Sequence, residues 1–307
     1  MTLTELRYIV AVARERHFGR AAEACFVSQP TLSVSIKKLE EELDVKIFER
    51  GANEISVTPL GEEIVRQAQM VIEQAAAIKD IARRGKDPVS GPLRLGVIYT
   101  IGPYLLPDLV RQAIELVPQM PLMLQENFTA KLLEMLRTGE LDCAIMAEPF
   151  PDTGLAVAPL YDEPFMAAVP KSHALAKRKS LSTEELKNET MLLLGTGHCF
   201  RDHVLEVCPE YARFGSGEAD GIRKSFEGSS LETIKYMVAS GMGVTVVPQL
   251  SVPKDAQPHI KYIPFTKPAP TRRVVLVWRR TFTRYEAIAA LRNAIYACAL
   301  PGVKRLS

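Results

Sequence analysis

The sequence has no long uninterrupted apolar run. Hydrophobic residues make up 47% of its 307 positions, but charged residues interrupt the longest apolar stretches, and the first residues form no apolar leader. A transmembrane helix needs about 20 consecutive apolar residues, and a signal peptide needs an apolar core. We therefore expect a cytoplasmic protein without a membrane partner, large enough for two or three domains.

Neither basic nor acidic residues are in clear excess. The formal net charge is +2, and residues 1–88 carry 13 Lys and Arg against 14 Asp and Glu, a net of −1. A surplus of basic charge is the usual electrostatic sign of a nucleic-acid-binding protein. Any such binding must therefore depend on where individual charges lie.

Cysteine is rare and odd in number. The five thiols are Cys25, Cys143, Cys199, Cys208 and Cys298. Structural disulfides are uncommon in a reducing compartment, so a disulfide in this chain would be transient, as in a signal or a catalytic step. We expect Cys25, Cys143 and Cys298 to be structural, because each lies in an apolar context.

The other two thiols lie in residues 195–208, where a Gly-Thr-Gly turn precedes an apparent helix. The positive end of a helix dipole and cationic neighbours would favour the thiolate of Cys199. The cationic neighbours are His198, Arg201 and His203. Nine residues of helix rise about 13.5 Å, whereas a disulfide needs Cα atoms within about 7 Å. Cys199 and Cys208 therefore cannot bond while the helix is intact, and joining them would change the shape of the segment.

Two other interpretations of this segment stay open from the residues alone. The two cysteines could be unrelated, partly buried small side chains. A metal site could use four residues: His198, Cys199, His203 and Cys208. That set matches no familiar zinc spacing, so we expect no metal and no cofactor.

The first 58 residues predict three helices and two short strands. Apolar spacing indicates helices over residues 3–16 and 18–25. A third helix begins after Ser28, a good N-cap. Its buried stripe is Leu32, Ile36, Leu39 and Leu43. Residues 45–50 and 55–58 then predict a two-stranded wing.

The exposed side of the third helix offers hydroxyls, an amide and two lysines. Its candidate DNA-contacting residues are Gln29, Pro30, Thr31, Ser33, Val34, Lys37 and Lys38, with Ser35 on the same face. Such groups suit base edges and phosphates in a major groove. A polar helix surface with no ligand fits the same pattern.

A long helical segment, residues 59–86, carries an apolar stripe too long for a small winged domain to cover. The stripe is Ile64, Ala68, Val71, Ala75, Ile78 and Ala82. The stripe therefore needs a further partner surface, and packing onto the C-terminal part of the same chain is one possibility. A linker follows at residues 88–92.

The remaining chain alternates strands and helices. Residues 93–147 read as β-α-β-α-β, which indicates a parallel sheet with right-handed crossovers. A second unit follows, and the chain crosses between two α/β lobes near residues 162 and 267. A ligand would sit between the lobes at the carboxyl ends of strands, where Thr100 and Thr129 provide hydroxyls. Taken singly, each threonine fits the role of a helix cap better than that of a ligand contact, and the ordinary role of Arg272 would be a surface ion pair.

The N-terminal motifs resemble the LysR-type transcriptional regulators. The matching stretches are "FGRAAEACFVSQPTLSVSIKKLEEELDVKIFER" and "VTPLGE". The resemblance implies an α/β chain made of a winged helix-turn-helix at 1–58, a linker dimerisation helix at 59–88, and a two-lobed, periplasmic-binding-protein-like effector domain at 89–307. Lobe I would hold about 91–161 and 268–307, and lobe II about 162–267. The wing carries Asn53 where many family members have arginine, so the resemblance does not extend to that phosphate contact.

The effector half resembles the hydrogen-peroxide-sensing members of that family. The matching stretches are "VIYTIGPYLLP", "GELDCAIM", "LGTGHCFRDHVLEVC", "SSLETIKYMVASGMGVTVVP" and "PAPTRRVVLVWR". The resemblance implies that peroxide oxidises Cys199 to a sulfenic acid and that Cys208 resolves it to a disulfide. It also implies a peroxide pocket lined by Thr100, Thr129, His198 and Arg272. Arg273 is the adjacent alternative, facing the other side of the strand.

The expected protein is thus a homo-oligomeric activator of oxidative-stress genes, a dimer of dimers that binds promoter DNA and contacts RNA polymerase. Two rivals remain. One is a LysR-type regulator that binds a small metabolite between the lobes, with incidental cysteines. The other is a thiol peroxidase, against which the N-terminal DNA-binding pattern argues, so we expect no enzyme activity.

Overall fold

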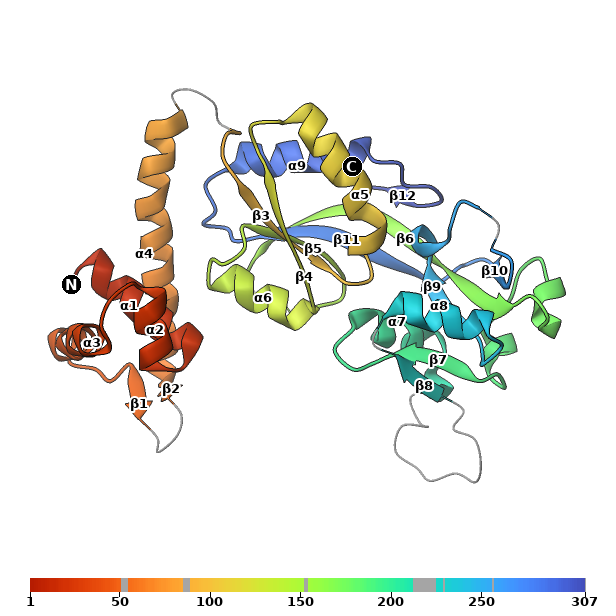
Figure 1. The fold of residues 1–307 in the computed structure, drawn as a ribbon, viewed down its shortest axis with the longest axis horizontal. Helices are drawn as coiled ribbons and strands as arrows, with labels where there is room; N and C mark the ends of the chain where they lie inside the picture. Colours follow the sequence, from red (N-terminus) through yellow and green to blue (C-terminus); the bar gives the residue numbers. More distant parts are fainter. Residues whose placement is uncertain are drawn as a thin grey trace.

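The computed structural model describes residues 1–50, 55–84, 89–151, 154–211, 225–228, 230–255 and 257–306. Its buried hydrophobic side chains gather in three separate cores. One core lies in the N-terminal domain, and the other two lie within residues 93–300. A long helix, α4 (Pro59–Arg84), stands between the N-terminal domain and the rest (Figure 1). No helix of the described ranges is long and apolar enough to span a bilayer.

The N-terminal domain contains the three predicted helices and the antiparallel pair. Its elements are α1 (Leu3–Glu15), α2 (Phe18–Ala24), α3 (Gln29–Leu43), β1 (Phe48–Arg50) and β2 (Ile55–Val57). The Ser28 hydroxyl accepts from the Thr31 N–H, which confirms the predicted cap of α3. Leu43 is exposed, so the prediction of a four-residue buried stripe on α3 is wrong at its last position. Asn53, in the predicted wing turn, lies outside the described residues.

Helix α4 makes two kinds of contact within its own chain. Near its start it packs against α1 and contributes the buried Ala68 to the N-terminal core. Farther along, the Glu73 carboxylate pairs with Arg279 at 2.7 Å and accepts a hydrogen bond from Thr281 at 2.6 Å. Val71 and Ile78 of the predicted stripe remain exposed. Helix α4 therefore contacts its own effector half, and pairing with a twin helix stays a prediction.

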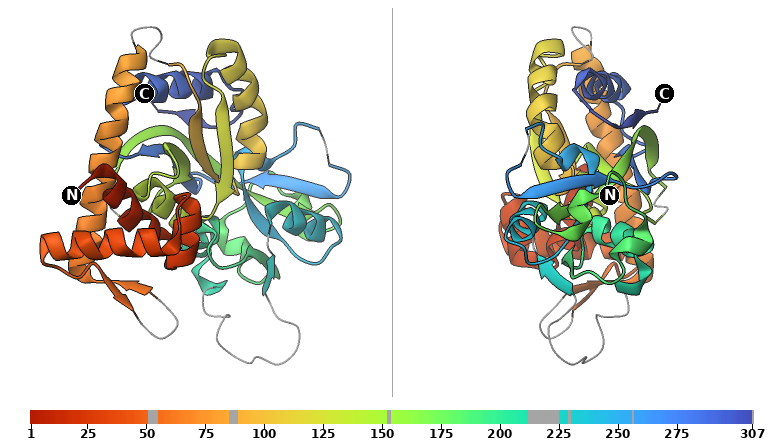
Figure 2. Two further views of the ribbon diagram at one scale, coloured as in Figure 1. Left: turned by 60° about the vertical axis from the view of Figure 1, so that its left-hand side comes forward. Right: turned by 90° about the vertical axis from the view of Figure 1, so that its right-hand side faces the viewer.

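Lobe I is built on the predicted β-α-β-α-β unit. Its elements are β3 (Leu93–Ile98), α5 (Gly102–Leu116), β4 (Leu122–Asn127), α6 (Thr129–Arg137) and β5 (Cys143–Ala147), completed by β11 (Thr271–Trp278) and α9 (Tyr285–Ala297). Strand β3 pairs in parallel with β4 and β5, as predicted, and β11 pairs antiparallel with β5. Helices α5 and α9 pack on one face of the sheet and α6 on the other (Figures 1 and 2).

A long strand that the sequence pattern did not predict, β6 (Ala156–Pro170), runs through both lobes. Its first part pairs with β11 in lobe I, and its last part pairs with two strands of lobe II. The remaining elements of lobe II are β7 (Met191–Leu194), α7 (Cys199–Val207), β8 (Ser225–Gly228), α8 (Leu231–Ala239), β9 (Thr245–Pro248) and β10 (Ile260–Pro264). The two lobes therefore share one continuous strand, and the chain returns to lobe I between β10 and β11.

Candidate functional site

Helix α7 holds the two thiols of the predicted sensor segment at its opposite ends. Cys199 is its first residue and Cys208 is its C-cap. Cys199 is half-buried and packs against the core of lobe I, whereas Cys208 is 1% exposed in the core of lobe II. The helical rise over nine residues is about 13.5 Å, well beyond the roughly 7 Å limit for bridged Cα atoms. The reduced thiols are therefore out of bonding reach.

Arg272 lies beside the Cys199 end of the helix, held between Thr100 and Glu163. Its guanidinium donates to the Thr100 hydroxyl at 2.8 Å and to the Thr100 carbonyl at 3.0 Å. It also pairs with Glu163 at 2.8 Å, and both side chains are almost completely buried. The second Glu163 oxygen accepts from the Leu250 N–H at 2.8 Å. The alternative of a surface ion pair is therefore wrong for Arg272 and describes Arg273, whose partner is Asp162.

The pKa of Cys199 departs from the sequence expectation. Burial raises the pKa of this thiol, and the Thr129 hydroxyl and the Arg272 charge lower it only in part. The prediction of a stabilised thiolate is therefore wrong, because position at a helix N-terminus does not outweigh removal from water. Thr129 is the first residue of α6 and does not cap it. Its buried Oγ1 has no hydrogen-bond partner among the described residues. The hydroxyl nevertheless lies close enough to Cys199 to lower the pKa of that thiol.

Two of the three expected cationic neighbours of Cys199 form hydrogen bonds with backbone carbonyls. Arg201 donates to the Leu194 carbonyl at 3.0 Å. A ring nitrogen of His203 lies 2.7 Å from the Glu148 carbonyl, and burial lowers the pKa of this imidazole. His198, the N-cap of α7, packs its ring against aromatic neighbours. The charge of Arg272, from a distant strand, lowers the pKa of the thiol.

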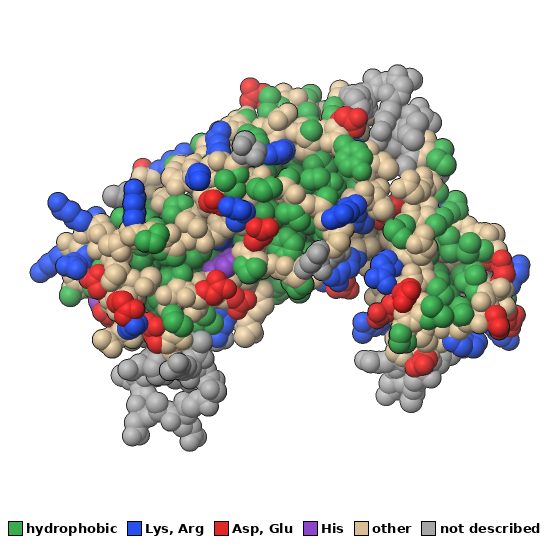
Figure 3. Space-filling model, turned by 180° about the vertical axis from the view of Figure 1, so that it is seen from behind, with side chains coloured by type: hydrophobic (Ala, Val, Ile, Leu, Met, Phe, Trp, Pro, Cys, Tyr) green, Lys and Arg blue, Asp and Glu red, His purple; other side chains and the backbone are tan. Residues whose placement is uncertain are grey.

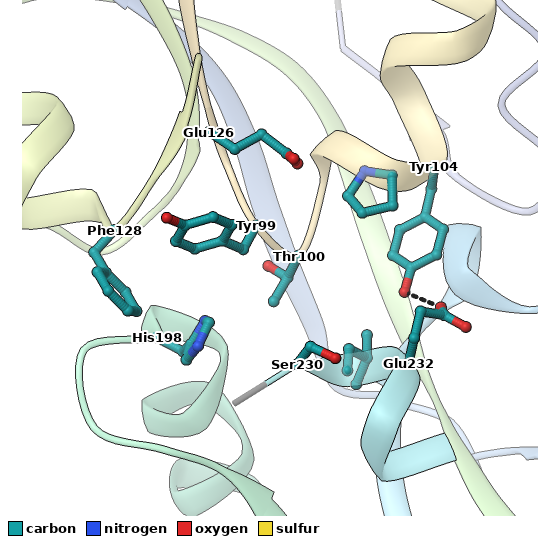
Figure 4. A pocket seen from close by; sticks show the side chains of 10 residues that line it. Tyr99, Thr100, Tyr104, Glu126, Phe128, His198, Ser230 and Glu232 are labelled. Carbon is teal, nitrogen blue, oxygen red and sulfur yellow. Dashed lines mark hydrogen bonds between the residues drawn. The ribbon is translucent and has the colours of Figure 1, made fainter. Parts of the chain in front are cut away.

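Two cavities meet at this end of α7. A chamber of about 10 Å³ lies against Cys199, and its walls include Thr100, Thr129 and His198. That volume holds about one water-sized molecule. A wider cavity of about 310 Å³ opens beside it, lined by Tyr104, Glu126, Glu232 and others (Figure 4). The structure thus brings the predicted Thr100, Thr129 and His198 together around the sulfur, and Arg272 reaches the chamber through Thr100.

Sequence reasoning missed three residues of this site. Glu163 holds Arg272, and the rings of Tyr99 and Phe128 form part of the chamber wall. Tyr99 and Phe128 each follow directly after a parallel strand, the position already used to select Thr100 and Thr129. The same signal would therefore have found both rings, but nothing in the sequence pairs Glu163 with Arg272.

The other cysteines have surroundings unlike that of Cys199. Cys143 and Cys298 are buried in the core of lobe I, and Cys25 packs against the N-terminal core. Burial raises the pKa of both Cys143 and Cys298. In the described part of the chain, no group of three or more His, Cys, Asp and Glu side chains could hold a metal ion.

The predicted DNA-contacting face of α3 is largely open to solvent. Its exposed members are Gln29, Pro30, Thr31, Val34, Lys37 and Lys38, and Ser33 is half-buried. The Thr31 hydroxyl lies 2.8 Å from that of Ser28, and Lys37 pairs with Glu41 at 3.6 Å. The surface seen in Figure 3 mixes acidic and basic side chains. This mixture agrees with the low net charge of the chain, so any DNA binding would depend on the individual side chains of α3.

Comparisons with known proteins support both halves of this description. Residues 3–62 match the bacterial regulatory helix-turn-helix proteins of the lysR family, and residues 86–297 match the LysR substrate binding domain. The chain is 39% identical to a hydrogen peroxide-inducible genes activator of Pectobacterium carotovorum subsp. carotovorum, over 94% of this chain and 95% of that protein. It is 38% identical to the DNA-binding transcriptional dual regulator OxyR of Escherichia coli (strain K12), over 94% of each.

Solved structures of OxyR proteins share the fold. Full-length OxyR C199D from Pseudomonas aeruginosa aligns with a TM-score of 0.81 at 50% identity, covering 97% of this chain and 96% of that one. A cysteine-to-serine variant of Corynebacterium glutamicum OxyR with hydrogen peroxide bound aligns with a TM-score of 0.61 at 32% identity, covering 96% of this chain and 93% of that one. The chain belongs to the LysR family of bacterial regulatory helix-turn-helix proteins.

Proposed function

We propose that this LysR-family regulator senses hydrogen peroxide through Cys199 and controls oxidative-stress genes. One observation carries the proposal. A thiol at the wall of a chamber sized for one small molecule lies beside a buried arginine, while a second thiol is sealed in a different core nine residues away. A site of this kind can register a small oxidant and convert it into a change of shape.

The first chemical step is oxidation of Cys199. Its sulfur attacks one peroxide oxygen, the O–O bond breaks, and the departing oxygen leaves as water after taking up the thiol proton. Cys199 becomes a sulfenic acid and the peroxide is reduced. Thr100, Thr129, His198 and Arg272 are placed to hold the two oxygens in line with sulfur, and Arg272 stabilises the negative charge on the leaving oxygen.

The second step joins the two thiols. Cys208 attacks the sulfenic sulfur, a disulfide forms, and water leaves. Burial raises the pKa of Cys208 to about 12, so this thiol is a poor nucleophile until it leaves the lobe II core. Phe200 and Val204 lie in that core as well. The disulfide therefore requires α7 to unwind and part of the lobe II core to repack.

The change in lobe II would reach DNA through the assembly. We propose a homotetramer, a dimer of dimers, in which α4 pairs with its twin through the exposed Val71 and Ile78 and sets the spacing of the winged domains. We propose domain boundaries at residues 1–58, 59–88 and 89–307. RNA polymerase is a further proposed partner of the activating form. The site of action is the cytoplasm, where promoter DNA lies.

DNA reading is proposed for the exposed face of α3. Gln29, Thr31 and Ser33 would contact base edges, Val34 would contact a thymine methyl group, and the lysines would contact phosphates. Pro30 shapes the first turn of the helix. The proposed residues are Gln29, Pro30, Thr31, Ser33, Val34, Lys37 and Lys38. The protein is a regulator and not an enzyme, since one oxidation event per chain suffices for the signal.

A peroxide titration tests the proposal. The reduced chain is treated with increasing hydrogen peroxide, its thiols are counted, and the mass of the peptide spanning residues 199–208 is measured. We expect two thiols to be lost per chain, with a mass decrease matching one disulfide. The Cys208→Ser chain should instead retain a trappable sulfenic acid at Cys199 and show a weaker change in DNA binding.

The cavity of about 310 Å³ supports one alternative function, a regulator that responds to a small metabolite bound between the lobes. Unchanged thiol content under peroxide, together with normal regulation of DNA binding in a Cys199→Ser chain, would favour that alternative. Peroxide consumption far beyond one equivalent per chain in the presence of a reductant would favour a thiol peroxidase.

A further inference from the structure

The small chamber beside Cys199 and the wider cavity share one wall. Four residues line both spaces: Tyr99, Thr100, Phe128 and His198. The chamber measures about 10 Å³ and the wider cavity about 310 Å³. The second volume lies in the range of cavities that bind organic ligands, whereas the first holds about one water-sized molecule. The residues between the two spaces therefore decide which molecules can pass from the wider cavity to the Cys199 sulfur.

Three rings form most of that wall. The rings of Tyr99 and Phe128 meet edge-on with centroids 5.2 Å apart, and the His198 ring lies 4.8 Å from Phe128 and 5.8 Å from Tyr99. Figure 4 shows the three rings turned toward one another between the strand ends of lobe I and the start of α7. Each ring thus contacts both others. We call Tyr99, Phe128 and His198 the aromatic wall.

The aromatic wall closes the seam between the lobes. Tyr99 follows β3 and Phe128 follows β4, both in lobe I, whereas His198 precedes α7 in lobe II. Gly197 has φ +96, and a Cβ added there would lie 3.3 Å from the Phe128 ring. A glycine allows both this backbone conformation and the close approach of the ring. The local sequence therefore favours a tightly closed wall.

We propose that the aromatic wall is a size filter that admits hydrogen peroxide to Cys199 and excludes organic hydroperoxides. This inference rests on the proposed function and adds a basis for its substrate choice. The wider cavity accepts either kind of molecule and serves as a vestibule. Only the slim O–O unit of hydrogen peroxide passes to the chamber, because a bulky alkyl or aryl group on the peroxide would overlap the rings.

The chemistry itself does not distinguish the two oxidants. With any hydroperoxide the Cys199 sulfur takes one oxygen, the O–O bond breaks, and the other oxygen leaves with the thiol proton as water or as an alcohol. The same residues on the lobe I side of the chamber would assist both reactions. A preference for one oxidant would therefore come from access to the sulfur. On the side of the wider cavity, the residues that border both spaces are Thr100 and the three rings of the aromatic wall.

The test compares two oxidants at one sulfur. In a Cys208→Ser background, the rate of sulfenic acid formation at Cys199 is measured by trapping and mass spectrometry with hydrogen peroxide and with cumene hydroperoxide. We expect the parent chain to favour hydrogen peroxide strongly. Phe128→Ala should raise the ratio of the cumene hydroperoxide rate to the hydrogen peroxide rate by about 10- to 100-fold, the scale of steric discrimination in pockets.

Two further variants make the comparison specific. Phe128→Leu keeps an apolar side chain without the ring and should give an intermediate ratio. Tyr236→Ala removes a ring that is 74% exposed and lines neither cavity, so it should leave the ratio unchanged. Because Phe128 is itself 37% exposed, its truncation should not prevent folding.

The possible results separate this inference from the proposed function. If hydrogen peroxide does not oxidise Cys199 in the parent chain, the proposed function fails. If it does, but the parent chain reacts equally fast with cumene hydroperoxide, or Phe128→Ala leaves the ratio unchanged, the size filter alone is overturned. A raised ratio in both Phe128 variants, with none in Tyr236→Ala, supports it.

Discussion

The two ends of α7 differ in what surrounds each thiol. At the first residue, Cys199 packs against lobe I, borders a small chamber and has Thr129 and Arg272 to oppose the effect of burial on its pKa. At the C-cap, Cys208 is enclosed by lobe II, and the Lys187 charge lowers its raised pKa only in part. The two environments suggest separate tasks: one thiol meets the oxidant, and the other is withheld until the helix opens.

This difference also indicates how an oxidation signal could be kept free of accidental disulfide formation. Each thiol belongs to a different core, so both cores constrain the helix between them. A disulfide can form only after at least one of these packing arrangements is lost. The free-energy difference between packed and unpacked α7 should therefore govern the second step, and access to the chamber should govern the first.

The largest effect should come from removing Arg272 at the Cys199 end. Arg272→Met would leave the Glu163 carboxylate, which is 0% exposed, without its cation. Breaking a buried pair in this way typically destabilises a protein by about 3–5 kcal/mol. Urea unfolding of the effector domain should show this loss, and the rate of Cys199 oxidation should fall as well.

Arg273→Met is the matched control, because Arg273 pairs with Asp162 at the surface. An exposed pair contributes about 0–1 kcal/mol, so this variant should unfold near the parent midpoint. Replacing Arg272 and Glu163 together by methionine should restore much of the stability lost in Arg272→Met, since no unpaired charge stays buried. Equal losses in Arg272→Met and Arg273→Met would contradict the assignment of Arg272 as the buried partner.

The pH dependence of Cys199 oxidation should follow its raised pKa. Burial favours the protonated thiol at neutral pH, and the thiolate is the reactive form. Below the pKa the thiolate fraction grows about tenfold per pH unit. In the Cys208→Ser chain, the rate of sulfenic acid formation should therefore keep rising between pH 6 and pH 8.

A depressed pKa would produce a different curve. The rate would then level off below pH 8, because the thiol would already be ionised. Sulfenic acid formation at saturating trapping reagent distinguishes the two cases directly. Thr129→Val should lower the whole curve, since the Thr129 hydroxyl lowers the pKa that burial raises.

The helices and the parallel unit could be predicted from the sequence, but β6 could not. Its residues include Pro159 and Pro164 beside Asp162 and Glu163, a composition typical of a loop. The register with β11 shifts at Leu160, which lies between the pairs Val274–Tyr161 and Val275–Pro159, so Pro159 lies next to a bulge, where the ladder is already interrupted. Such a compensation depends on the partner strand and cannot be read from β6 alone.

The site shows the same division. Their position at the ends of predicted strands identified Thr100 and Thr129. The nine-residue spacing predicted that Cys199 and Cys208 lie at opposite ends of α7. Glu163 could not be found, because a glutamate in a polar stretch is expected at the surface and its partner Arg272 lies 109 positions away. The thiolate expectation failed for a related reason: local residues indicate nearby charge, whereas burial depends on the packing of two lobes.

The smallest expected effect tests the helix between the thiols. Glu206 is an exposed residue of α7, so Glu206→Gly would weaken the helix by about 1 kcal/mol without disturbing either core. If unwinding limits the second step, disulfide formation after a pulse of peroxide should be about fivefold faster, with an unchanged rate of Cys199 oxidation. Glu206→Ala removes the same charge but favours the helix, so it should not accelerate the step. Acceleration in both variants would point to charge, and acceleration in neither would mean that release of Cys208 from the lobe II core, and not the helix itself, keeps the sulfurs apart.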